Sequence, residues 1–188
     1  MSILGEVSGI IRKRLSEKSP LIVAIDGRCA SGKTTLAQKL REEFQCNTIS
    51  ADHFFLQPHQ RTKERLSTAG ENIDHERFLS EVLVPLKANK DFYYRPFDCS
   101  TGGFGEEIHI KSQPLTIIEG SYCCHHKLRE YYDIKLFLTI SPEEQKKRIV
   151  LRDGAEKAEI FKNKWIPLEE EYFTKCDIKN HCDYIFTV

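Results

Sequence analysis

The chain has 188 residues, 40% of them hydrophobic, which is enough for one domain with a substantial buried core. Its 28 basic and 28 acidic residues cancel, and this balance argues against a broad nucleic-acid-binding surface. Every apolar run falls well short of the ~20 residues that cross a membrane, and seven cysteines without a recognisable signal peptide favour reduced thiols in the cytoplasm. We therefore expect one cytoplasmic domain over residues 1–188 without a nucleic-acid or membrane partner. The oligomeric state stays open, a homo-oligomer included.

The first elements alternate between helix and strand. Apolar residues at helical spacing predict an amphipathic helix near the N-terminus: Ile3, Val7, Ile10, Ile11 and Leu15. Ser19 and Pro20 end this helix, and residues 21–25 then form a short apolar run that is typical of a buried parallel strand. Beyond residue 35 a second helix is predicted by the spacing of Leu36, Ala37, Leu40 and Phe44.

The stretch between this strand and this helix, residues 27–35, reads GRCASGKTT and matches the phosphate-binding pattern G-x-x-x-x-G-K-T. Its glycines let the backbone curl so that the amides point into one concavity, to which the helix N-terminus adds its positive dipole. Lys33 would reach the β- and γ-phosphates of ATP, and the Thr34 hydroxyl would ligate Mg²⁺. The residues expected to bind the nucleotide are Gly27, Ala30, Ser31, Gly32, Lys33, Thr34 and Thr35.

Three acidic residues end predicted strands close to this loop. Residues 47–50 predict a second strand that leads to Asp52, and residues 115–118 predict a third strand that closes on Glu119. Ligands of open α/β sheets bind outside the carboxyl ends of the strands, so both carboxylates are placed near the phosphates. Glu119 best fits a Walker-B role in holding Mg²⁺, and Asp52 best fits the base that accepts a hydroxyl proton. Asp26 is the alternative base, or else a brace for the loop, and either aspartate could instead cap a turn.

A long excursion, about residues 52–114, separates the second and third strands and is mostly polar and rich in turns. Because loops of this length are usually functional, we expect it to bind the acceptor substrate. It contains one clear helix, which starts near Asp74 and carries Phe78, Val82, Leu83 and Leu86 on one face. Three aromatic residues after this helix either stack on a base or pack in the core: Tyr93, Tyr94 and Phe97.

The remaining sequence completes an α/β pattern. Residues 134–140 predict a fourth strand, after which Ser141 and Pro142 begin a helix that runs to about Arg152. A second helical stretch, about residues 158–173, is expected to be interrupted at Pro167, and residues 184–188 predict the last strand. Strands that alternate with helices predict a parallel sheet covered on both faces.

The segment of about residues 146–164 is basic and follows the fourth strand. It is either a solvated helix face or a small helical lid that closes over the triphosphate. In the lid interpretation Arg148 and Arg152 are the phosphate clamps, because a guanidinium group binds phosphate in a bidentate way.

The run Cys123-Cys124-His125-His126 invites a zinc interpretation. Four adjacent residues cannot all converge on one ion, however, and Cys176 and Cys182 do not supply a second ligand pair at zinc-site spacing. The sequence therefore favours the start of a helix with small buried thiols.

Several of these segments together resemble the uridine kinase branch of the phosphoribulokinase and uridine kinase family, over nearly the whole chain. Residues 27–34 match its phosphate loop, 50–55 (SADHFF) its S-x-D-x-F-Y segment, and 72–75 (NIDH) its N-F-D-H element. Phe97 and Asp98 stand in place of its Y-D pair, Glu119 and Gly120 match its E-G strand end, and residues 148–153 resemble the start of its arginine-rich lid.

The resemblance implies a P-loop NTPase fold with a five-stranded parallel sheet in the order 2-3-1-4-5. It also implies transfer of the γ-phosphoryl group of ATP, with Mg²⁺, to a small nucleoside-like acceptor, specifically the 5′-hydroxyl of uridine or cytidine. Lys33, Asp52, Arg148 and Arg152 would be catalytic, Thr34 and Glu119 would hold the metal, and Asp74 would grip the ribose hydroxyls. The acceptor-binding residues would be Asp52, Phe55, Asp74, Tyr94 and Phe97.

The chain differs from this family at positions expected to contact the nucleobase of the acceptor. Phe97 replaces the tyrosine of the Y-D pair, and residues 99–105 lack the family's histidine. We therefore expect uridine and cytidine to be used about equally well. Two alternatives remain: a kinase of another small alcohol, such as a sugar or a vitamin precursor, and a nucleotide-dependent regulatory protein.

Overall fold

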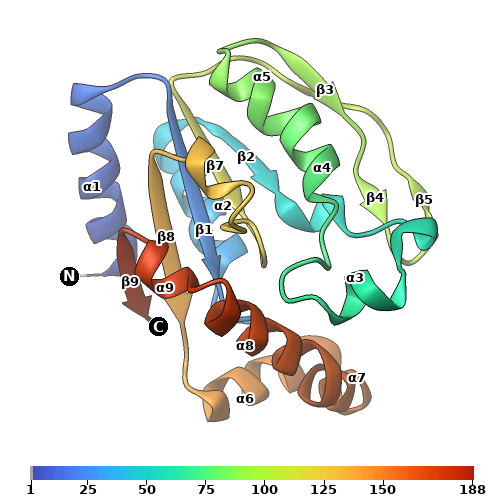
Figure 1. Cartoon of the computed structure of the whole chain (residues 1–188). Coiled ribbons are helices and arrows are strands. Elements are labelled where there is room, and N and C mark those ends of the chain that lie inside the picture. Colours follow the sequence, from blue (N-terminus) through green and yellow to red (C-terminus); the bar gives the residue numbers. More distant parts are fainter. Residues whose placement is uncertain (1) are drawn as a thin grey trace.

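The computed structural model describes residues 2–188. Within this range the central sheet has five strands, all of them parallel, in the order β2-β7-β1-β8-β9 (Figure 1). Counted along the chain within this sheet alone, the order reads 2-3-1-4-5. The strands are β1 (Leu21–Gly27), β2 (Asn47–Ser50), β7 (Leu115–Glu119), β8 (Ile134–Thr139) and β9 (Tyr184–Thr187). The predicted α/β fold with a parallel sheet and helices on both faces is confirmed.

Strand β1 lies in the middle of the sheet and is buried along its whole length. Its side chains alternate between two apolar clusters, as the pleat of a strand requires. Leu21, Val23 and Ile25 pack with helices α1 (Ile3–Glu17) and α2 (Lys33–Phe44) on one face. Ile22 and Ala24 pack on the other face with residues of α4 (His75–Phe78), α5 (Val84–Lys87) and α8 (Ile166–Lys175). A strand covered on both sides must be apolar throughout, which explains its sequence.

The excursion after β2 begins with a 3₁₀ turn, Ala51–Phe54, and a second such turn at Pro58–Gln60. The predicted helix near Asp74 is confirmed: it comprises α4 (His75–Phe78), a π-helical turn (Leu79–Leu83) and α5 (Val84–Lys87). The sequence prediction missed several short elements, namely α3 (Lys63–Ser67) and two small antiparallel sheets, β3 (Phe92–Tyr94) with β6 (Ile108–Ile110) and β4 (Phe97–Asp98) with β5 (Gly103–Phe104).

The predicted interruption at Pro167 is wrong. After α6 (Pro142–Asp153) the chain continues through α7 (Ala155–Ile160), a π-helical turn (Phe161–Trp165) and α8 (Ile166–Lys175). Pro167 directly follows the π-helical turn, whose altered hydrogen-bond pattern accommodates a residue without an amide donor inside the helix. A short α9 (Ile178–His181) then leads to β9.

The helix start predicted at residues 123–126 is also wrong, because residues 121–128 form a series of turns before a 3₁₀ turn at Arg129–Tyr131. Tyr122 has a φ of 70°, which is incompatible with a right-handed helix. The predicted burial of Cys123 and Cys124 is confirmed. Across residues 2–188, every helix is too short or too polar to cross a membrane.

Candidate active site

The phosphate loop connects β1 to α2 and lies at the carboxyl edge of the sheet. Gly27 has a φ of +136°, and a Cβ atom there would lie 2.0 Å from the carbonyl oxygen of Leu138 on the neighbouring strand. Gly32, just before α2, has a φ of +91°. Both positions therefore require glycine, for close approach at the first and for the left-handed turn at the second. The loop thus has the curled geometry that points its amides and the α2 N-terminus toward an anion.

Lys33 lies inside this loop and is 8% exposed. Its Nζ donates hydrogen bonds to the carbonyl oxygens of Gly27, at 2.7 Å, and Arg28, at 3.0 Å. These contacts hold a positive charge at the mouth of the loop. Such a fixed charge is what a transferring phosphoryl group needs beside it.

Thr34 and Glu119 lie side by side where α2 begins and β7 ends. The Thr34 Oγ1 donates a hydrogen bond to Glu119 Oε2 at 3.0 Å. Parallel pairing of β7 with both β1 and β2 sets Glu119 opposite Ile25 and Ser50, at the sheet edge that bears the loop. A hydroxyl and a carboxylate oxygen are hard donors of the kind that Mg²⁺ prefers, so the pair fits the metal predicted for it.

Asp52 follows β2 at the same edge and is exposed to solvent on one side. A Cβ atom at Gly120, the residue after β7, would lie 2.9 Å from Ala51 Cβ and 3.2 Å from Asp52 Oδ1. The absent side chain therefore lets the ends of β2 and β7 approach one another. The pKa of Asp52 is raised to about 6. The larger cause is the loss of hydration beside the surrounding protein atoms, and the second is the negative charge of Glu119.

The carboxylate of Asp26, the alternative base, is buried and hydrogen-bonded within the protein. It is 0% exposed, and its carboxylate accepts hydrogen bonds from the amides of Gly27 and Cys124 and from the Tyr172 hydroxyl, at 2.7, 2.8 and 2.8 Å. Burial raises its pKa despite these bonds. Asp26 thus braces the loop against the 121–125 turns and α8, which favours Asp52 as the base.

Glu169, on α8, is a site residue that sequence reasoning missed. It is 5% exposed, and its two oxygens accept hydrogen bonds from the Cys29 amide at 3.0 Å and the Ser121 hydroxyl at 2.8 Å. Burial raises its pKa, and the nearby charge of Lys33 opposes this effect. Residues 169–171 are all glutamate, so nothing in the sequence marks this one as the residue that turns inward.

Two of the predicted acceptor residues, Tyr94 and Asp74, contact the 51–55 segment that contains Asp52. Phe55 pairs with Ile73 in an isolated antiparallel bridge, which brings the 51–55 segment against the start of α4. The Tyr94 hydroxyl lies 3.0 Å from Nδ1 of His53, another residue not singled out from the sequence. Burial lowers the pKa of His53 and raises that of Tyr94 to about 12, so both groups are neutral near pH 7.

Phe97 and Tyr94 are mostly buried side chains, each 4% exposed. Phe97 packs edge-on against Phe104, with ring centroids 5.6 Å apart, and Tyr94 packs against Phe54 at 5.3 Å. Tyr93, in contrast, is 55% exposed and stacks on His109. This geometry favours packing over base stacking for Phe97.

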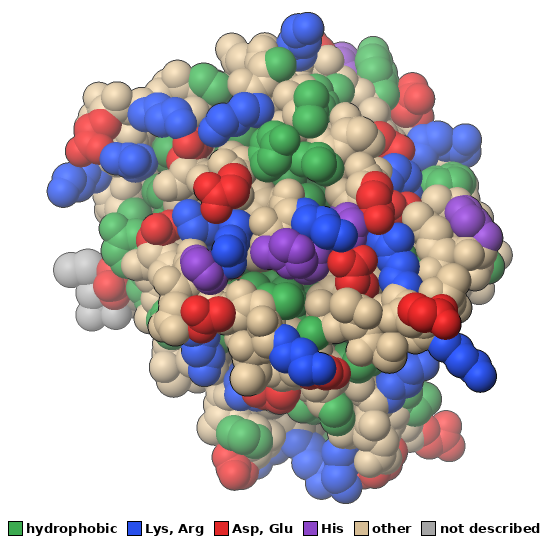
Figure 2. Space-filling view, viewed as in Figure 1, with side chains coloured by type: hydrophobic (Ala, Val, Ile, Leu, Met, Phe, Trp, Pro, Cys, Tyr) green, Lys and Arg blue, Asp and Glu red, His purple; other side chains and the backbone are tan. Residues whose placement is uncertain are grey.

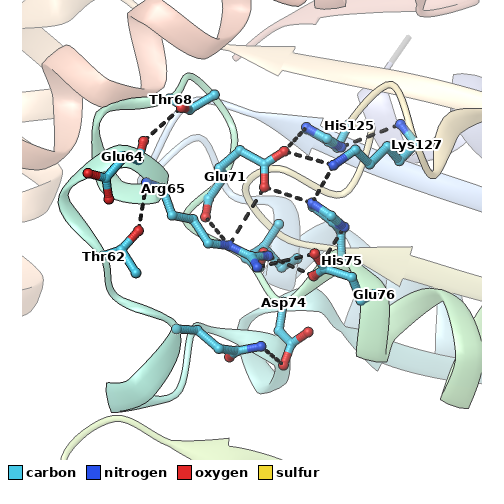
Figure 3. Close-up of polar contacts among 12 residues, drawn as sticks. Thr62, Glu64, Arg65, Thr68, Glu71, Asp74, His75, Glu76, His125 and Lys127 are labelled. Atoms are coloured by element: carbon cyan, nitrogen blue, oxygen red, sulfur yellow. Dashed lines mark hydrogen bonds and ion pairs between the residues drawn. The ribbon is translucent and has the colours of Figure 1, made fainter.

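Asp74 caps α4 through a hydrogen bond from the Arg77 amide to Oδ1, at 3.1 Å. Its Oδ2 accepts a second hydrogen bond from Gln60 Nε2 at 2.8 Å (Figure 3), and the residue is 2% exposed. The capping role is therefore present in the structure. The amide side chain of Gln60 is itself held, because its oxygen accepts a hydrogen bond from the Gln57 amide at 2.8 Å.

Arg148 and Arg152 extend from α6 to residues 29 and 30 of the phosphate loop. One guanidinium nitrogen of Arg148 lies 3.5 Å from the Ala30 carbonyl oxygen, and one of Arg152 lies 3.6 Å from Cys29 Sγ. Each is also paired within its helix, Arg148 with Glu144 at 3.0 Å and Arg152 with Asp153 at 2.8 Å. The two arginines thus lie beside the loop, as a lid would require.

The curled loop, its enclosed lysine and the parallel sheet form the fold of the P-loop kinases, and the carboxylates at the ends of two neighbouring strands lie at the sheet edge that bears the loop. No protein-family model matches the chain. The uridine kinase of Anoxybacillus flavithermus is 28% identical over 151 residues, which cover 74% of this chain and 70% of that protein.

Two solved structures share the fold. A possible uridine kinase from Bacillus stearothermophilus superimposes with a TM-score of 0.67 and 18% identity over 94% of this chain and 98% of that one. A candidate fructose transport system kinase from Silicibacter sp. TM1040 superimposes with a TM-score of 0.73 and 18% identity over 99% of both chains. The resemblance to uridine kinases and related P-loop kinases is thereby confirmed.

Proposed function

We propose that this chain transfers the γ-phosphoryl group of ATP to a hydroxyl group of a small molecule. The observation that carries the proposal is the convergence at one sheet edge of Lys33, the Thr34–Glu119 pair and Asp52. Phosphoryl transfer needs a phosphate cradle, a metal site and a group that accepts the hydroxyl proton, and these residues supply one of each.

Thr34 and Glu119 would hold Mg²⁺, which neutralises charge on the β- and γ-phosphates when it is bound. Lys33 adds a second positive charge that belongs to the protein. Arg148 and Arg152 would clamp the phosphates from the lid of about residues 146–164, because they already lie beside Cys29 and Ala30.

Asp52 would orient the acceptor hydroxyl and take its proton. A pKa of about 6 leaves the carboxylate ionised at neutral pH, yet makes it a stronger base than an ordinary aspartate. Asp26 cannot take this role in the same geometry, because three hydrogen bonds already engage its carboxylate.

The acceptor that we propose is the 5′-hydroxyl of a uridine- or cytidine-like nucleoside, bound within the region of about residues 52–114. The similarity to uridine kinases supports this choice, as does the position of Asp74 beside the 51–55 segment. The ribose hydroxyls would displace Gln60 and donate hydrogen bonds to the Asp74 carboxylate.

A second candidate is a kinase of another small alcohol, such as a sugar or a vitamin precursor. One observation favours it: both Asp74 oxygens already have partners within the protein, so this carboxylate has a structural role that needs no ribose. An N-cap of this kind contributes ~1 kcal/mol to folding and nothing to binding.

The test is acceptor-stimulated ADP formation with uridine, cytidine, their 2′-deoxy forms, sugars and vitamin precursors. If Asp74 binds the ribose, a 2′-deoxy acceptor should lose roughly 10²-fold in kcat/KM, because a buried carboxylate is left unpaired. Asp74→Ala should erase this difference, whereas Glu107→Ala, which removes an exposed carboxylate of the same region, should preserve it.

Uridine and cytidine should be used within about tenfold of each other, a gap of ~1.4 kcal/mol, because Phe97 cannot donate a hydrogen bond to the base. Stimulation by a sugar or vitamin precursor but by no nucleoside would favour the second candidate. ATP binding without any acceptor-stimulated turnover would indicate a nucleotide-dependent regulatory protein instead.

A further inference from the structure

A cluster of nitrogen and sulfur donors lies where two segments that are distant in the sequence meet. His125 and His126 come from the turns after β7, and Cys176 directly follows α8. One ligand atom from each of the three lies within 4.8 Å of the others. The sequence argument weighed the run 123–126 with Cys176 and Cys182 as a second ligand pair, and it did not consider the two histidines with Cys176 alone.

His125 is the buried member of this cluster, and its Nδ1 accepts a hydrogen bond from the Lys127 amide at 3.4 Å. The side chain is 0% exposed, and its Nε2 has no hydrogen-bond partner. A Cβ atom at Gly70 would lie 2.8 Å from His125 Cδ2, so the Cδ2–Nε2 edge of the ring faces the 69–71 segment. Cys176 faces the same segment, with Sγ 3.7 Å from the Ala69 carbonyl oxygen.

A buried imidazole nitrogen without a partner is costly, and native proteins usually satisfy such groups. His126 is exposed and tilts toward His125, with ring centroids 4.1 Å apart, which leaves one side of the cluster open to solvent. On the face of the molecule drawn in Figure 2, histidine side chains lie at the surface near the middle, between basic and acidic side chains.

We propose that His125, His126 and Cys176 bind one zinc-type transition-metal ion, with water in the fourth position. Two imidazoles and one thiolate are a donor set that Zn²⁺ accepts, and a tetrahedral site with three protein ligands keeps one position open. Nitrogen and sulfur donors select against Mg²⁺, so this site is chemically distinct from the oxygen pair of Thr34 and Glu119.

The surroundings supply an acidic group beside the site. Glu71 Oε1 lies 3.7 Å from His125 Nε2, and Glu71 also accepts contacts from Lys127 Nζ at 3.1 Å and His75 Nε2 at 2.8 Å (Figure 3). The Glu71 carboxylate offsets the charge of Lys127, and the Cys176 thiolate offsets part of the charge of the metal ion.

Binding would fasten the end of α8 to the 125–126 turn. Both segments also hold the phosphate loop, α8 through Glu169 and the preceding turn through the Cys124 amide. The metal ion would therefore act as a structural clamp on the side of the molecule that carries residues 69–76.

The experiment is titration of the full chain with Zn²⁺ against a coloured chelator, and with Co²⁺ as a spectroscopic probe, both in excess Mg²⁺. We expect one equivalent of Zn²⁺ per chain and a Co²⁺–thiolate charge-transfer band. Loss of a direct ligand should weaken binding by at least 10²-fold, so His126→Ala and Cys176→Ser should both lose the signal. His126 is exposed, and its replacement leaves the core intact.

Matched controls are His59→Ala and Cys99→Ser, which remove an exposed histidine and an exposed thiol outside the cluster. Both should bind Zn²⁺ as the unaltered chain does. The proposal is overturned if His126→Ala binds as tightly as His59→Ala, or if no equivalent is bound in excess Mg²⁺. It is also overturned if Cys124→Ser alone abolishes binding, because the metal would then lie at the buried Asp26–Cys123–Cys124 group.

Discussion

Lys33 is held by two backbone carbonyls of its own loop, so its charge is positioned before any ligand arrives. Lys33→Ala should lower turnover well beyond ~10²-fold, because the transferring phosphoryl group loses a fixed positive charge. The check is the rate of ADP formation together with the thermal unfolding curve. Lys39→Ala, an exposed lysine on the same helix, is the control and should keep full activity. Near-normal turnover of Lys33→Ala would contradict the assigned role.

Substitution of the two carboxylates at the strand ends should have different effects on the kinetics. Asp52→Asn should lower turnover while the Mg²⁺ dependence stays the same, because the base is lost and the Thr34–Glu119 pair is intact. Glu119→Gln should raise the Mg²⁺ concentration needed for half-maximal rate. Titrating both variants with Mg²⁺ measures this difference, and identical curves would show that the two residues do not divide these roles.

Asp52 should also make stability depend on pH. Its pKa is about 6 in the folded chain against 3.8 for the unperturbed group, so the folded state binds the proton more tightly than the unfolded state. This residue therefore favours folding less as the pH rises through about 4 to 6. Asp52→Asn removes this pH-dependent destabilisation. The increase in Tm of the variant over the unaltered chain should therefore be larger at pH 7.5 than at pH 4.5. A gain that is equal at both pH values would exclude a raised pKa.

The proposed lid comprises α6 and the helical segments after it. Arg148→Ala and Arg152→Ala should each raise the KM for ATP and lower kcat, by about 10-fold to 10²-fold, because each lies beside the loop that holds the phosphates. Their pairs with Glu144 and Asp153 are surface contacts, so the fold should change little. Lys147→Ala, on the same helix and exposed, is the control. Equal kinetics for all three variants would argue for a solvated helix face.

The regular elements could be predicted because each carries its own local pattern. The strands β1 and β7 are continuous apolar runs, and α6 has a serine cap followed by proline. Pro167 was misjudged because the π-helical turn before it is a property of the packed helix, without a sequence signal. The short antiparallel pairs of the excursion are only two or three residues long, too short for an alternating pattern to mark them.

At the scale of the whole molecule, the buried Asp26 carboxylate joins the sheet to α8 and to the 121–125 turns. Tyr172→Phe should reduce the free energy of unfolding by ~1–3 kcal/mol, because a buried carboxylate loses one hydrogen-bond donor. Urea unfolding measures this loss. Tyr93→Phe, which alters a 55% exposed tyrosine, should change little, and an equal effect of both substitutions would show that the Asp26 contact contributes nothing.

The sequence by itself determined the strand–loop–helix unit around residues 27–35, the parallel sheet, and the carboxylates of Asp52 and Glu119 at its edge. These features follow from local patterns and from the rule that parallel strands end at a common edge. The tertiary structure decided which side chains share space across long stretches of chain. In the folded chain, Asp26 accepts a hydrogen bond from Tyr172, and Glu169 accepts one from the phosphate loop. Cys176 lies close to His125. Such contacts depend on how α8 packs against the sheet, and no spacing along the chain records that packing.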